Sequence, residues 1–237
     1  MEKKKNDFIA QGSILAIASI LVRVMGMIYR IPMTAIIGDK GNGFYSYAYS
    51  VYTILLLLSS YSLPLAVSKM VSAKAQLGQW RNVKRVFICA IAFAIGIGTT
   101  FGLIVLIGAQ FFTRVFFHSE LAAIALRFMA PTILIMALLG VFRGFFQGLQ
   151  NTLPTAVSQI VEGLINAIMS VVFAYFLFDF GHGMDAAGGT TDLGYAWGAA
   201  GGAIGTGAGA LAGLIFCFIL FVAYRKILAV NISRDKT

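Results

Sequence analysis

Long apolar stretches alternate with short polar connections along the whole chain. Six of these stretches can cross the roughly 30 Å hydrocarbon core of a bilayer as helices, because an α-helix rises about 1.5 Å per residue. The pattern therefore predicts an all-α integral membrane protein, built as a bundle of six transmembrane helices. We place the spans near residues 8–37, 43–68, 86–112, 120–148, 154–178 and 195–224.

The composition agrees with insertion into a membrane. Hydrophobic residues make up 59% of the chain and charged residues 11%, with a mean hydropathy of +0.86. Soluble domains are about 45–50% apolar and about 25% charged. The net charge of +9 does not indicate nucleic-acid binding, since the basic residues fall between apolar segments rather than on one soluble surface.

Lys and Arg are distributed unequally among the connections. Segment 1–7, the connection around 69–85 and the tail 225–237 are rich in them, whereas the connections on the other side carry only Lys40 and Arg114. Cytoplasmic flanks of membrane proteins carry the excess of positive residues. We therefore expect a multi-pass protein of the plasma membrane with both termini in the cytoplasm.

Two arginines interrupt the first apolar stretch, within ILVRVMGMIYRIP at 20–32. An arginine at the bilayer centre costs at least about 2.5–3.5 kcal/mol, so Arg23 and Arg30 require a reason. Residues seven apart share one helix face, about 10 Å apart along the axis, and Gly26 lies between them. A guanidinium donates two parallel hydrogen bonds to a phosphate. We hypothesise that Arg23, Arg30 and Gly26 face a cavity and hold the phosphate or pyrophosphate of a substrate.

Polar positions on three helices are candidates for lining the same cavity. They are Ser19 in the first span, Tyr49, Ser50, Tyr52 and Thr53 in the second, and Gln159 and Asn166 in the fifth. Glu162 and Arg143 lie at similar depths from the ends of their spans, which predicts an ion pair or a coupling element. Snorkelling of Arg30, packing of the tyrosines and a static Arg143–Glu162 clamp remain open alternatives.

Motifs for enzymatic chemistry are not found in the sequence. It contains no nucleotide-binding GxxxxGK[ST] and no nucleophile beside a base, and His118 and His182 lack companions at metal-ligand spacing. The glycines of the sixth span recur every fourth residue, from Gly201 to Gly213, which is typical of closely packed membrane helices. We expect a transporter without a cofactor rather than an enzyme.

Two long motifs resemble a known family. They are RVMGMIYRIPMTAIIGDKGNGFYSYAYSVYTILLLLSSYSLPLAVSKMVSAKAQLG and FRGFFQGLQNTLPTAVSQIVE. Both are similar to bacterial polysaccharide-exporter membrane proteins, of the sporulation and lipid II flippase types, in the multidrug/oligosaccharidyl-lipid/polysaccharide exporter superfamily. The resemblance implies two six-helix lobes around a cavity, working by alternating access on an undecaprenyl-pyrophosphate-linked sugar. It also implies that this chain corresponds to the first lobe and requires a second.

The resemblance is not complete at the arginines. Arg23 matches the first cavity arginine of the lipid II flippases, but the position of the second is Tyr29 here, and Arg30 follows it. A further arginine of those flippases has no equivalent in ILLLLSSYSLPLA. The leading hypothesis is a flippase of a lipid-linked cell-wall precursor, with lipid II the first candidate. The alternatives are a cation-coupled multidrug exporter, which would favour cavity acids, and a non-transporting half-lobe.

Overall fold

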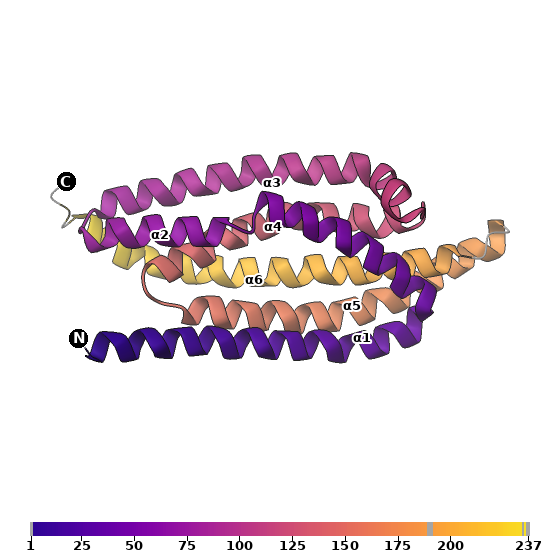
Figure 1. Ribbon diagram of the computed structural model, residues 1–237, viewed down its shortest axis with the longest axis horizontal. Coiled ribbons are helices and arrows are strands. Elements are labelled where there is room, and N and C mark those ends of the chain that lie inside the picture. Colours follow the sequence, from indigo (N-terminus) through magenta and orange to yellow (C-terminus); the bar gives the residue numbers. More distant parts are fainter. Residues whose placement is uncertain (1, 189–191, 234, 236–237) are drawn as a thin grey trace.

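The computed structural model describes residues 2–188, 192–233 and 235, and the regular structure of these residues is entirely helical. The elements run lengthwise side by side (Figure 1). Their bounds are α1 Glu2–Ser59, α2 Leu63–Gln76, α3 Trp80–Phe117, α4 Ala122–Gly148, α5 Leu153–Gly188 and α6 Leu193–Ser233.

Helix α1 contains a sharp kink at Gly38, where the chain turns back on itself. Gly38 has φ 63° and ψ −178°, a backbone conformation that a residue with a side chain rarely adopts. The first half of α1 runs the length of the bundle, and the second half returns on the other side of the kink (Figure 1). The two halves correspond to the first two predicted spans.

Five stretches are long and apolar enough to cross a membrane, which makes this a multi-pass membrane protein. They are Gly12–Gln76, Trp80–Phe117, Ala122–Gly148, Leu153–Ala186 and Leu193–Ser233. The predicted count of six is not matched in full, because the helical path through the Gly38 kink joins the first two spans into one stretch. The second predicted span, 43–68, is also interrupted between Ser59 and Leu63, with Pro64 in the first turn of α2.

Helices α5 and α6 pack closely along the glycine stripe of α6. A Cβ atom added to Gly201, Gly205 or Gly209 would overlap Phe173, Ser170 or the backbone carbonyl of Glu162, respectively. Small residues let membrane helices approach to backbone contact. The packing interpretation of this stripe is confirmed, and close packing holds the polar residues of α5 beside α6.

The two termini lie at the same end of the bundle, which is also the end of the α2–α3 connection (Figure 1). The Gly38 kink and the α3–α4 connection lie at the opposite end (Figure 1). Helix α5 continues past the predicted end of its span, residue 178, and reaches Gly188. The described residues between the fifth and sixth predicted spans, 179–188 and 192–194, are therefore largely helical. That the termini face the cytoplasm stays a prediction.

Substitution of Gly205 by alanine should destabilise the protein. The new methyl group would overlap Ser170 of α5, and overpacking of this kind costs about 1–3 kcal/mol. Gly96→Ala on α3 is the matched control, because its methyl group would meet no atom within 4 Å. Thermal unfolding in detergent should show a lower midpoint for Gly205→Ala only. Equal midpoints for the two variants would contradict the close packing of α5 and α6.

Candidate functional site

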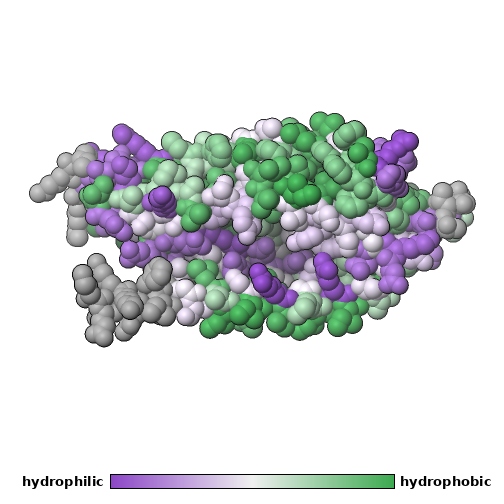
Figure 2. All heavy atoms as spheres, in the orientation of Figure 1, coloured by the Kyte–Doolittle hydropathy of each residue, from purple (hydrophilic) through white to green (hydrophobic). Residues whose placement is uncertain are grey.

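A cavity of about 490 Å³ lies between the two halves of α1, helix α5 and helix α6. Hydrophilic residues gather along the middle of the face shown in Figure 2, between two hydrophobic bands. The polar lining of the cavity consists of Arg23, Tyr29, Arg30, Tyr45, Tyr49, Tyr52, Glu162, Asn166 and Thr206, with Gly26 and Gly163 between them.

Arg23, Gly26 and Arg30 lie on the same cavity wall, as their helical spacing predicts. Both arginines are exposed, and neither guanidinium forms an ion pair with any side chain that the structure describes. A Cβ atom added to Gly26 would meet no atom within 4 Å. This wall of the cavity is therefore cationic, and the space in front of Gly26 contains no other atoms of the described residues.

The first half of α1 is held against α5 at Gly163. A Cβ atom at Gly163 would lie 3.0 Å from Cε of Met25 and 3.3 Å from a methyl of Val22. The absence of a side chain there lets the cationic face of α1 approach the polar face of α5. This contact brings Arg23 and Arg30 to the cavity that Glu162 and Asn166 also line.

The opposite wall is a row of tyrosines from the second half of α1. The rings of Tyr45 and Tyr49 stack with centroids 5.8 Å apart, and those of Tyr49 and Tyr52 are 5.9 Å apart at a tilt of 43°. The hydroxyl of Tyr45 is 3.2 Å from Thr206 Oγ1 of α6. Positions 45, 49 and 52 share one helix face, so the wall presents phenol rings toward the arginines.

Ser50 and Thr53 lie on a different face of the helix and do not line the arginine cavity. They also lie outside a smaller adjoining cavity, which is described below. Ser50 Oγ donates to the carbonyl of Ser46 at 2.8 Å, and Thr53 Oγ1 donates to the carbonyl of Tyr49 at 2.8 Å. Hydroxyls bonded within their own helix need no polar cavity. Ser19 is half-buried and also lies outside both cavities.

Arg143 and Glu162 come together as an ion pair, with Arg143 Nη2 2.6 Å from Glu162 Oε2. Arg143 Nε also donates to Ser158 Oγ at 2.9 Å. The side chains are 11% and 25% exposed, so each charge has lost much of its hydration and depends on the other. Glu162 lines the large cavity, whereas Arg143 lines a neighbouring cavity of about 250 Å³.

Gln159 lines the neighbouring cavity and not the one that contains the arginines. Tyr29, Tyr45 and Thr206 also line the arginine cavity and were not among the residues predicted from the sequence. Two signals were present: Tyr45 precedes Tyr49 by one helical turn, and Thr206 is a polar residue within a glycine-rich helix. Tyr29 and Arg30 both line the cavity, so the one-residue shift seen in the sequence leaves both side chains on its wall.

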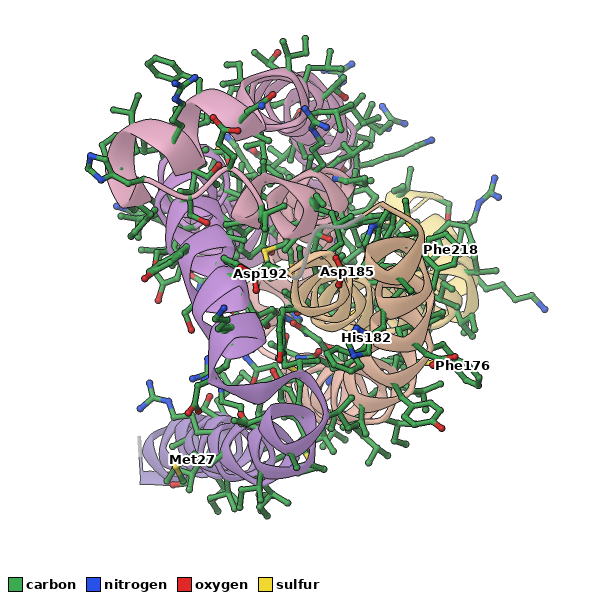
Figure 3. The ribbon with its side chains drawn as sticks, turned by 90° about the vertical axis from the view of Figure 1, so that its right-hand side faces the viewer. Met27, Phe176, His182, Asp185, Asp192 and Phe218 are labelled. Carbon is green, nitrogen blue, oxygen red and sulfur yellow. The ribbon has the colours of Figure 1, made fainter. Side chains whose placement is uncertain are left out.

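Side chains at the end of the bundle near the kink hold α1, α5 and α6 together. Asp185 of α5 accepts hydrogen bonds from the backbone N–H groups of Leu193 and Gly194, at 3.0 and 2.9 Å. Lys40 Nζ, just after the kink, lies 2.9 Å from Asp192 Oδ1. Asp185, Asp192 and His182 are labelled in Figure 3.

No group of three or more metal-ligating side chains occurs within the described residues.

The sequence profile of the polysaccharide biosynthesis protein family matches residues 8–235. Stage V sporulation protein B of Bacillus subtilis (strain 168) is 26% identical over 228 residues, which are 96% of this chain and 41% of that protein. Lipid II flippase MurJ of the same organism is 27% identical over 163 residues, 65% of this chain and 30% of that protein. The chain therefore spans less than half the length of these relatives. No solved structure gives a significant match.

Removal of either partner of the Arg143–Glu162 pair should destabilise the protein. An uncompensated charge left in a partly buried site costs about 3 kcal/mol. Arg143→Met and Glu162→Gln should each lower the thermal midpoint, and the double variant should recover part of the loss. Single variants that unfold like the unaltered protein, or losses that simply add in the double variant, would contradict the pairing.

Proposed function

Because the chain belongs to the polysaccharide biosynthesis protein family, we propose that it is part of a flippase for a lipid-linked cell-wall precursor. The substrate is an undecaprenyl-pyrophosphate-linked sugar, and lipid II is the leading candidate. Similarity to the lipid II flippase of Bacillus subtilis supports this substrate class. Transport proceeds by alternating access in the bacterial plasma membrane, with no bound cofactor.

The observation that carries the proposal is the presence of Arg23 and Arg30 on one wall of one cavity. The carboxylate of Glu162 in that cavity is already paired with Arg143, so the cavity has an excess of positive charge. A pyrophosphate fits this charge, since each guanidinium can donate two parallel hydrogen bonds to its oxygens. The open space at Gly26 lets a phosphate approach the helix between the two side chains.

The charge of the cavity argues against export of cationic drugs. A carrier for cations would need an available acid, and Glu162 forms a 2.6 Å ion pair with Arg143. We assign the pair a coupling role instead. In that role, breaking of the ion pair would leave Arg143 uncompensated and add positive charge beside the substrate.

The proposed topology has six crossings, the first made by the first half of α1 and the second by its second half together with α2, with both termini in the cytoplasm. It is supported by the return of the chain at Gly38 and by the two termini lying at one end of the bundle (Figure 1). The Lys and Arg residues of 69–85 and 225–237 belong to segments at that same end. Segment 1–7 and the tail 225–237 are then cytoplasmic.

A second lobe completes the transporter in this proposal. The chain covers 41% and 30% of the two relatives, so both of them contain further sequence. Transporter sites commonly lie at the interface of two related halves. The second lobe would close the cavity over the substrate, and it is either continuous with this chain, a separate chain or a second copy.

Substitution of either cavity arginine should weaken binding of undecaprenyl pyrophosphate. Arg23→Gln and Arg30→Gln each remove charge-assisted hydrogen bonds worth about 1.5–3 kcal/mol, which corresponds to at least about a tenfold loss of affinity. Arg127→Gln is the control, because Arg127 is an exposed arginine of α4 outside the cavity. Equilibrium binding to the protein in lipid nanodiscs measures all three. Equal losses for Arg127 and the cavity arginines would contradict the pyrophosphate site.

Complementation should depend on a second lobe. The chain is expressed in cells depleted of their lipid II flippase, either alone or fused to the second half of a related flippase. We expect growth with the fusion only, because the fusion closes the cavity. Growth with the chain alone would indicate that two copies form the transporter. Failure of both, with membrane expression verified, would contradict lipid II as the substrate and favour a non-transporting lobe.

A further inference from the structure

A second polar cavity of about 250 Å³ lies next to the arginine cavity. The two cavities share Leu56 and Met136 in their walls, so they adjoin inside the bundle. The second cavity is lined by Ser60 and Tyr61 of the α1–α2 connection and by residues close to the α4–α5 connection, such as Gln147 and Thr155. Its volume is many times the roughly 10–15 Å³ of accessible space that one water molecule needs, so it can hold a group larger than a single water.

The second cavity has uncharged polar side chains among apolar ones, and it has almost no uncompensated charge. Gln147, Thr155 and Gln159 line it together with Ser60 and Tyr61. The only charged lining residue is Arg143, whose guanidinium is held by Glu162 and Ser158. The adjoining cavity, in contrast, has two arginines without ion-pair partners among the described residues. The two cavities therefore differ in the chemistry that they can recognise.

Gln159 is the residue of the second cavity that most clearly requires a ligand. Its side-chain oxygen is buried and has no hydrogen-bond partner among the described residues. Buried polar atoms in folded proteins are nearly always paired, so an orphaned amide oxygen calls for an unseen donor. The amide nitrogen of Gln147 donates a hydrogen bond to Thr155 Oγ1 at 3.4 Å. Gln147 therefore provides a second amide group in the lining of the same cavity.

We propose that the second cavity binds the uncharged sugar of the substrate while Arg23 and Arg30 hold its pyrophosphate. A sugar hydroxyl both donates and accepts hydrogen bonds, so it can pair with either atom of a glutamine amide and with the threonine and serine hydroxyls. A metal cation would be repelled by Arg143, and a second phosphate would find that guanidinium already occupied. The inference rests on the proposed function, since the pyrophosphate fixes where the sugar lies.

The test compares two lipids that share undecaprenyl pyrophosphate, of which only lipid II continues into a sugar-containing headgroup. Binding of undecaprenyl pyrophosphate and of lipid II is measured for the full chain in nanodiscs, with the unaltered protein, Gln159→Met and Gln110→Leu. Gln110 is an exposed residue of α3 outside both cavities and serves as the control. Methionine keeps the length of the side chain and leaves no orphaned oxygen, so Gln159→Met should unfold at or above the original temperature.

We expect the unaltered protein and Gln110→Leu to bind lipid II about tenfold more tightly than undecaprenyl pyrophosphate. Gln159→Met should lose this preference and keep the affinity for undecaprenyl pyrophosphate. The inference is overturned if the unaltered protein shows no preference, if Gln159→Met retains it, or if both affinities fall equally. Failure of the unaltered protein to bind either lipid would instead overturn the pyrophosphate site, and the sugar site with it.

Discussion

The cost of placing guanidinium groups among apolar helices is the constraint on which the rest of the structure depends. Arg23 and Arg30 lie within a stretch whose other face carries exposed apolar residues such as Ile17, Leu21 and Ile28. Lipid cannot solvate the charges, so the helix must turn them toward a polar interior. The cavity between the two halves of α1, α5 and α6 meets this requirement.

Several features of the fold serve to assemble that cavity. The kink at Gly38 returns the chain so that the tyrosine wall faces the arginine wall. Gly163 lets α1 approach α5, and the glycine stripe of α6 lets α6 approach α5 from another side. Glu162 lines the cavity with the two arginines, and its partner Arg143 lines the adjoining cavity, whose other lining residues are uncharged. Close backbone packing and this distribution of charged side chains give two adjoining cavities of different chemistry.

The sequence predicts the arginine face well, because a spacing of seven residues within one helix determines which side both residues share. It also identifies Arg143 and Glu162 as partners from their depth. The assignment of Ser50 and Thr53 to the cavity stays a prediction, and polarity alone does not reveal that both hydroxyls bond to carbonyls of their own helix. The separation of Gln159 from Asn166 into two cavities depends on tertiary packing of α2 and α4, which helical spacing does not encode.

The most direct test of the central claim is an experimental structure of this chain in a nanodisc with undecaprenyl pyrophosphate bound. We expect phosphate density beside Gly26, within hydrogen-bonding distance of both Arg23 and Arg30, with the Arg143–Glu162 pair intact next to it. Phosphate density at the end of the bundle that carries the Lys- and Arg-rich segments 69–85 and 225–237, with only water in the arginine cavity, would contradict the proposed site. The two results differ in the position of a strongly scattering group, so they are readily distinguished.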